Sequence, residues 1–126
     1  MKITINQAIA KADSLKNDNR YDTEIKIQWL NNLDMMIADE IIRKHEDGKD
    51  FVFKGYDANT PGDTELLVPE PYTDIYVHWL HSKMDLFNQD YERYNSSAAA
   101  FYSEYQNYAA HYNREHEPIK QKITVF

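Results

Sequence analysis

Two histidines and two aspartates recur at helical spacing and raise the question of a metal site. Asp74, His78, His81 and Asp85 follow one another at three- and four-residue intervals, and imidazole and carboxylate groups are ligands that zinc and related metals accept. Neighbouring side chains on one straight helix rarely complete a coordination shell, and the sequence contains neither Glu-x-x-His nor His-Glu-x-x-His. A solvated or interface-forming helix face is therefore favoured, and we expect no metal and no other cofactor.

Other catalytic signatures are also missing from the sequence. Its serines occur in no Gly-x-Ser-x-Gly turn, and the three glycines form no phosphate-binding loop. His111 and His116 fall near the end of a predicted helix, where positive charge complements the helix dipole. We therefore expect no catalytic residue and no enzyme activity.

Charge and composition limit the classes of partner. The 126-residue chain fits one domain, has a formal net charge of −7 and contains no cysteine. The negative charge argues against general binding to nucleic acid or to an anionic membrane surface, since both need clustered Lys and Arg. No apolar run reaches the length of a signal peptide or a membrane span.

The first half of the chain predicts two helices. Thr4 and Gln7 have the spacing of a capping box, which places the first helix at 4–16. Asp22 can cap a second helix at 22–46, which Gly48 would stop. Two acid-before-base pairs, Asp39 with Arg43 and Glu40 with Lys44, would support the outer face of the second helix.

Strand signals surround a cluster of turn residues and appear again at the C-terminus. Phe51–Phe53 and Glu65–Val68 are strand-like and flank Asn59, Pro61, Gly62 and Asp63, so we expect a β-hairpin arm at 50–69. Residues 121–126 are β-prone and predict a short C-terminal strand, able to pair within the chain or with another chain.

A long helix is expected at 71–116. Pro71 suits its first turn, and no Gly or Pro follows until Pro118. Apolar and aromatic residues recur at alternating three- and four-residue steps from Val77 to Tyr112, which is a heptad pattern. The predicted fold is thus mainly α: a small single-domain helical bundle with one long C-terminal helix, a β-hairpin arm and a short C-terminal strand.

Tyrosine occupies many positions of this pattern where leucine is usual. Tyrosine buries a large ring, needs a partner for its hydroxyl and is enriched at protein interfaces. Two readings stay open: the rings cover the other helices of the same chain, or they contact another subunit. The predicted interface residues are the tyrosine stripe (Tyr91, Tyr94, Tyr105, Tyr108 and Tyr112) and the arm residues Phe51, Phe53, Leu67 and Val68.

Three segments of the second half carry a family resemblance. They are the "VPEPY" lead-in, the "FNQDYERYN" middle and the "YNREHEP" end. In these segments the chain resembles small proteins of tailed phages and prophages of Gram-positive bacteria. The opening helices, "ITINQAIAKADSLKNDNRYDTEIKIQWLNNLD", also resemble those of this group. Those proteins are encoded near the capsid genes and are similar to head–tail connector (adaptor or head-completion) proteins. The resemblance covers most of the chain and transfers no functional residue.

The resemblance implies a helical fold with a β-arm and a homo-oligomeric ring. The ring would lie between the portal and the stopper or tail proteins of the virion, with DNA passing through it unbound. Before assembly the subunit would reside in the host cytoplasm. The alternative is a small cytosolic helical adaptor or regulatory module that dimerises through its tyrosine-rich long helix.

Overall fold

The computed structural model describes residues 1–16 and 21–119, and these form a mainly helical fold. The elements in chain order are β1 (Lys2–Thr4), α1 (Ile5–Leu15), α2 (Thr23–Glu40), the 3-10 turns η1 (Ile42–Lys44) and η2 (Glu46–Gly48), β2 (Glu65–Pro69), α3 (Asp74–Phe87) and α4 (Tyr91–Glu115). The predicted fold class is confirmed, including the long C-terminal helix. The predicted C-terminal strand at 121–126 lies outside the described residues.

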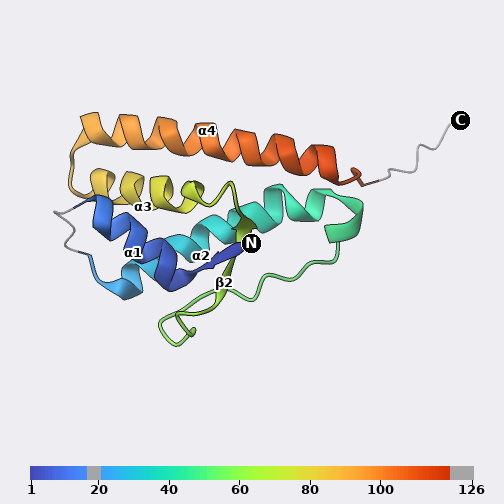
Figure 1. The fold of residues 1–126 in the computed structure, drawn as a ribbon, viewed down its shortest axis with the longest axis horizontal. Helices are drawn as coiled ribbons and strands as arrows, with labels where there is room; N and C mark the ends of the chain where they lie inside the picture. Colours follow the sequence, from blue (N-terminus) through green and yellow to red (C-terminus); the bar gives the residue numbers. More distant parts are fainter. Residues whose placement is uncertain (17–20, 120–126) are drawn as a thin grey trace, which may run out of the picture.

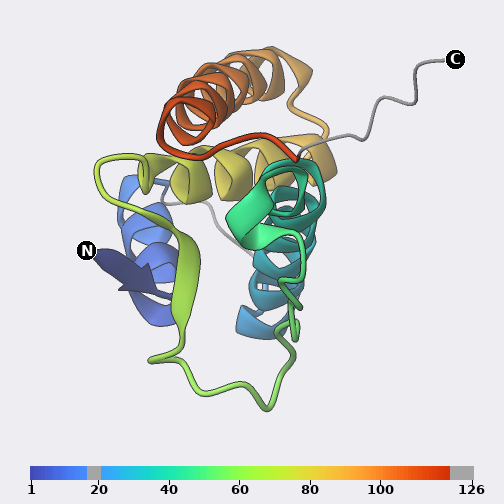
Figure 2. The ribbon, with the colours of Figure 1, turned by 90° about the vertical axis from the view of Figure 1, so that its right-hand side faces the viewer.

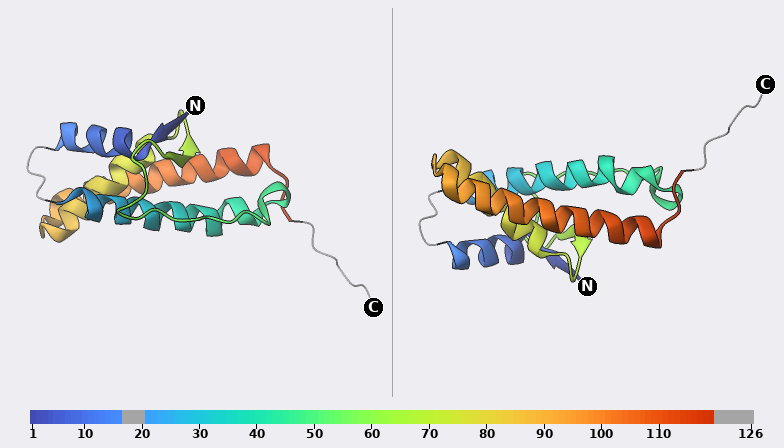
Figure 3. Two further views of the ribbon diagram at one scale, coloured as in Figure 1. Left: turned by 90° about the horizontal axis from the view of Figure 1, so that it is seen from below. Right: turned by 90° about the horizontal axis from the view of Figure 1, so that it is seen from above.

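The helices pack in three layers around α3. Seen along the bundle, α4 covers one side of α3, while α1 and α2 lie side by side on the other (Figure 2). Figures 1 and 3 show that α4 spans nearly the whole length of the bundle and crosses above α2. Because α3 has neighbours on both sides, it buries residues around most of its circumference, including the consecutive Ile75, Tyr76 and Val77.

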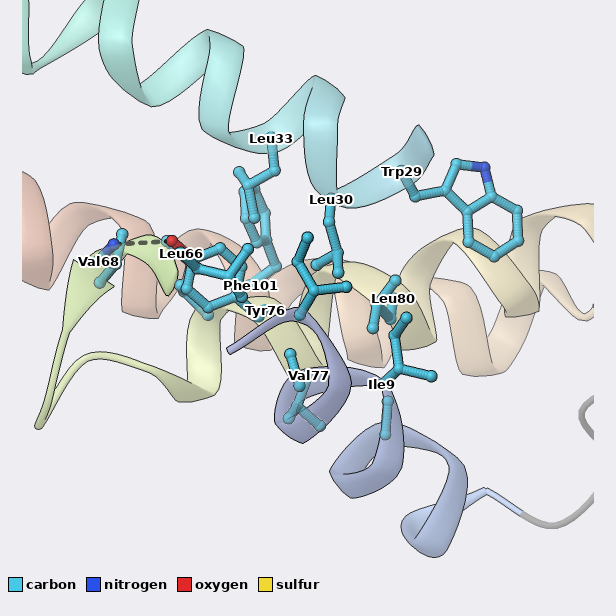
Figure 4. Close-up of a cluster of buried hydrophobic side chains, with 14 of the residues drawn as sticks. Ile9, Trp29, Leu30, Leu33, Leu66, Val68, Tyr76, Val77, Leu80 and Phe101 are labelled. Atoms are coloured by element: carbon cyan, nitrogen blue, oxygen red, sulfur yellow. Dashed lines mark hydrogen bonds between the residues drawn. The ribbon is translucent and has the colours of Figure 1, made fainter. Parts of the chain in front are cut away.

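The core collects side chains from every described helix and from β2 (Figure 4). Leu30 and Leu33 of α2, Leu80 of α3 and Leu66 of β2 have no exposed surface. Burying a side chain of this size contributes roughly 1.5–3 kcal/mol relative to leaving it in water. The packing of these faces, rather than intrinsic helix propensity, therefore holds the short helices in place.

The predicted start of α1 is confirmed. The Thr4 side chain accepts a hydrogen bond from the Gln7 amide at 3.1 Å, and the Gln7 side chain accepts one from the Thr4 amide at 2.9 Å. Both partners satisfy amides that a helix start leaves free. The apolar stripe of α1, which begins at Ile5, is then turned onto the core.

Helix α2 begins after Asp22, as predicted, but it ends at Glu40 and not near residue 46. Past Ile41 the chain tightens into the two 3-10 turns, and the buried His45 donates from Nδ1 to the Ile41 carbonyl at 2.6 Å. The predicted pair between Asp39 and Arg43 forms. Glu40 does not pair with Lys44; it accepts a hydrogen bond from the Tyr105 hydroxyl of α4.

The two-stranded antiparallel sheet joins β2 to β1 and not to Phe51–Phe53. The prediction of a strand near Glu65–Val68 is confirmed, whereas the predicted strand at Phe51–Phe53 is wrong, since these residues belong to no strand. Backbone hydrogen bonds hold the returning chain beside the start of α1: the Ile5 amide donates to Thr64 O and the Asn6 amide to Gly62 O, both at 3.0 Å.

The predicted single helix at 71–116 is wrong: α3 and α4 form a helical hairpin (Figure 1). After Phe87 the chain makes a Schellman motif, in which the Gln89 amide donates to Leu86 O at 3.0 Å and the Asp90 amide to Asp85 O at 2.9 Å. Gln89 has φ of 60°, in the left-handed region where glycine is usual. Asp90 then caps α4 by accepting from the Arg93 amide at 3.2 Å.

Candidate functional site

A polar cleft opens at the end of the bundle where α3 turns into α4. Its volume is about 640 Å³. It is lined by Lys16, His78, His81, Asp85, Asp90, Glu92, Arg93, Ser96 and Ser97. The cleft gathers two of the histidines and one of the aspartates that the sequence singled out, together with residues of α4 that it did not.

Asp85 is buried at the base of this cleft and is held on both carboxylate oxygens. Lys16 Nζ lies 2.5 Å from its Oδ1, and the Ser97 hydroxyl donates to its Oδ2 at 2.9 Å. The three residues connect the C-terminal end of α1 to α3 and α4. Since the carboxylate already has a cation and a hydroxyl as partners, the arrangement ties three helices together.

The four residues considered for a metal do not converge. Asp74 pairs with Lys11 at 2.6 Å, and Asp85 pairs with Lys16. His81 Nε2 lies 3.0 Å from the Ala12 carbonyl, which can only accept, and burial lowers the pKa of this histidine. Within residues 1–16 and 21–119, no three His, Asp or Glu side chains are grouped as metal ligands would be.

The tyrosine stripe is divided between the core and the surface. Tyr108 is buried against the bundle, and Tyr105 and Tyr112 are half-buried. Tyr112 stacks on His116 at 3.7 Å between ring centroids and meets His45 edge-on at 4.8 Å. These three tyrosines therefore pack against other parts of their own chain. Tyr94 is half-buried and Tyr91 is exposed.

An aromatic groove runs between α3 and α4, and Trp79, Tyr94 and Tyr102 are among its lining residues. It is a hollow of about 100 Å³ lined by Trp79, Ser82, Lys83, Leu86, Tyr94, Ala98, Phe101 and Tyr102. Lys83 Nζ lies 4.5 Å from the Trp79 ring centroid, a cation–π contact. Tyr102, which the sequence reasoning did not select, remains 62% exposed at the edge of the groove.

The predicted arm residues have different environments. Val68 has no exposed surface and is part of the core, and Leu67 is half-buried (Figure 4 shows Val68). Phe51 and Phe53 are half-buried on the extended segment that follows η2, where Phe53 contacts Tyr56 edge-on. Val68 and Tyr108 are therefore not available to a partner unless the bundle opens.

Asp34 forms a second buried carboxylate cluster, which the sequence reasoning missed. It accepts hydrogen bonds from the Tyr56 hydroxyl at 2.6 Å, the Tyr76 hydroxyl at 2.7 Å and the Leu67 amide at 3.1 Å. The Tyr76 oxygen in turn accepts from the Val68 amide at 2.7 Å, the dashed bond in Figure 4. Burial raises the pKa of Asp34 to about 6, although the three donors act in the opposite direction.

A signal for Asp34 was present in the sequence. The position falls four residues after Leu30 and three before Ile37, and so belongs to the apolar stripe of α2. A carboxylate on a buried stripe needs donors from other elements. Here they come from α3, β2 and the segment before β2, so the cluster fixes the sheet on the helices.

Comparisons with known proteins leave the family open: no family model, curated protein or solved structure matches this chain. None of the described helices combines the length and the apolar character needed to cross a bilayer.

Proposed function

We propose that the protein is a non-enzymatic structural subunit of a phage or prophage, a head–tail connector that forms a ring between portal and tail. The observation that carries an assembly role is the aromatic surface of the α3–α4 hairpin. Tyr91 and Tyr102 are 60% and 62% exposed, and eleven residues, about three turns, place them on the same face of α4. Aromatic rings left in water on one helix face are typical of protein interfaces.

The proposed occupant of this surface is a second copy of the chain. The aromatic groove lies beside Tyr102 and is rimmed by Lys83, while the chain as a whole carries a net charge of −7. An acidic side of a neighbouring copy complements the Lys83 rim. Contacts between two different faces of identical subunits form a ring where the rotation between subunits closes, and a ring is what the resemblance to connector proteins implies.

The charge also supports the proposed relation to DNA. A ring of strongly acidic subunits repels a passing duplex and gives no counterion-release affinity for it. DNA would therefore pass through without specific binding. The partners are other copies of the chain, the portal protein and stopper or tail proteins, at the head–tail junction of the virion.

Electron microscopy of the protein mixed with the portal protein of the same genome tests the proposal. We expect rings on the portal at micromolar concentrations, and no association at those concentrations would overturn it. Tyr102→Ser should weaken ring formation at least tenfold without changing the circular dichroism spectrum. Gln106→Ser is the matched control, because Gln106 is exposed on the same helix and carries no ring.

A second candidate is a small cytosolic helical adaptor or regulatory module that dimerises through α4. The observation that favours it is the same pair, Tyr91 and Tyr102, since two rings on one face can meet their own copies about a two-fold axis. Sedimentation separates the candidates. A tight dimer at all concentrations, without affinity for portal protein, supports the adaptor.

A further inference from the structure

The segment Phe51–Lys54 runs beneath α2 and belongs to no helix or strand (Figure 1). It is tethered at its start, where the Phe51 amide donates to Gly48 O at 3.0 Å and Arg43 Nη1 donates to Phe51 O at 3.1 Å. Two residues beyond it, the Tyr56 amide donates to the Asn31 side chain at 2.8 Å. Between these tethers, the backbones of Val52, Phe53 and Lys54 form no hydrogen bond with another described residue.

The side chains of this segment alternate as they do in a strand. Phe51 and Phe53 are half-buried, whereas Val52 and Lys54 are exposed, Val52 at 75%. Unpaired amides and carbonyls on an extended segment form an edge that another strand can extend by backbone hydrogen bonds. An exposed valine on such an edge is a position that a second strand would cover.

The sequence that follows Ile119 has the pattern of a strand. Residues 120–126 read "KQKITVF", an alternating β-prone run with two lysines. The exposed carboxylates Asp50 and Asp57 flank Phe51–Lys54 in sequence and attract Lys120 and Lys122, whereas Lys54 inside the segment opposes them.

The residues just before this run, Glu117–Ile119, are paired within their own chain with the η1–η2 region. The Glu46 amide donates to Glu117 O at 2.9 Å and the Ile119 amide to Lys44 O at 3.3 Å, with an antiparallel bridge at His45 and Pro118. His116 Nδ1 lies 2.6 Å from Asp47 Oδ2 and adds a side-chain tie. The backbone pairing is antiparallel, so Glu117 lies beside Glu46 and Ile119 beside Lys44. The chain therefore runs away from Gly48, the residue that leads into Phe51–Lys54.

We propose that residues 120–126 of one copy pair as a strand with Phe51–Lys54 of a neighbouring copy. This inference deepens the proposed function, because it rests on self-assembly and names a contact that links successive subunits. The donor strand and the acceptor segment are different parts of the chain, so the contact can repeat from copy to copy, as the proposed ring requires. The pairing takes place between free copies at high protein concentration and does not need the portal.

Cysteine cross-linking in this cysteine-free chain tests the pairing directly. Full-length Val52→Cys is mixed with full-length Val125→Cys or Ile123→Cys at about 100 µM in a glutathione redox buffer, and mixed dimers are followed on non-reducing gels. We expect mixed dimers at least tenfold faster than with the control, in which Met35→Cys replaces Val52→Cys. Met35 is 46% exposed on α2 and reports random collision.

Two outcomes overturn the pairing. One is a rate equal to that of the Met35 control. The other is an intrachain disulfide in the Val52→Cys, Val125→Cys double variant at low concentration, without mixed dimers from the single variants, which would place the strand in its own chain. Rings on the portal without the cross-link leave the connector function standing and remove this inference. A cross-link without portal association would support this inference and remove the connector function.

Discussion

Asp34 and Asp85 are both buried carboxylates on core helices, yet their surroundings differ. Asp34 has no exposed surface and is bound by three neutral donors from α3, β2 and the segment before β2. Asp85 is 3% exposed, lies at the base of an open cleft and is bound by the Lys16 ammonium and the Ser97 hydroxyl. Among the described residues, an ion pair is present at Asp85 and not at Asp34.

The two sites differ in whether the hydrogen-bond partners of the carboxylate can reach water once the carboxylate is removed. Of the partners of Asp34, Tyr76 is fully buried, so its hydroxyl would be left without water or any other acceptor, and buried unpaired donors are costly. Tyr56 and Leu67 are half-buried. Lys16 and Ser97 line the cleft and can turn to solvent. Burial alone therefore does not measure the importance of a buried charge; the access of its partners to water does.

Asp34→Ala gives the largest expected effect. It leaves two tyrosine hydroxyls and the Leu67 amide without their acceptor, and we expect a loss of about 3 kcal/mol in the free energy of unfolding. Urea denaturation followed by circular dichroism measures the loss. Asp34→Asn is the control that keeps the volume and one acceptor oxygen, so its loss should be clearly smaller.

Asp85→Ala should cost less, about 1.5 kcal/mol, because its former partners regain water at the cleft. A loss equal to that of Asp34→Ala would contradict the role assigned to the cleft. The matched control is Lys11→Ala, which removes the pair with Asp74. Both members of that pair are about half exposed, and we expect a change near zero.

Protonation of Asp34 should stabilise the fold as the pH falls, which is opposite to the destabilisation that acid usually causes. Its folded pKa of about 6 lies above the unfolded value of 3.8, so the folded state takes up the proton first as the pH falls. The resulting stabilisation is fully present below pH 3.8 and is lost as the pH rises through about 6.

Between pH 7.5 and pH 5 we therefore expect the wild-type chain to gain about 1 kcal/mol relative to Asp34→Asn. Urea denaturation of both proteins at the two pH values measures the gain. All other titrating groups are shared and cancel in the difference. A gap that stays constant, or that narrows at pH 5, would show that Asp34 keeps its charge throughout this range.

Local signals in the sequence predicted the elements whose ends are fixed by neighbouring residues. The Thr4 and Gln7 capping box and the strand near Glu65 are of this kind. Helix α2 also begins after Asp22, but the Asp22 side chain makes no capping hydrogen bond. The partner of β2 was missed because Lys2–Thr4 is some sixty residues away, and pairing at that distance depends on the packing of the helices between.

The site was less predictable than the fold. The turn at Asn88–Asp90 has no Gly or Pro, and the heptad spacing continues across it, so the pattern read as one helix. The aromatic groove exists only because that turn folds α4 back on α3, which brings Tyr94 beside Trp79. Residues that meet across a hairpin cannot be assigned to a groove while the hairpin itself is unrecognised.

The smallest expected effect is at the hairpin turn beside Asp85. Gln89 adopts a left-handed conformation that glycine adopts without strain. Gln89→Gly should therefore stabilise the fold by about 0.5 kcal/mol, measured as a higher urea midpoint. Gln106→Gly on the exposed face of α4 should instead lose up to about 1 kcal/mol, since it lies in a helix interior. If both glycines destabilise, then α3 and α4 run on as one rod in solution, and the groove that the hairpin creates is not present on the free protein.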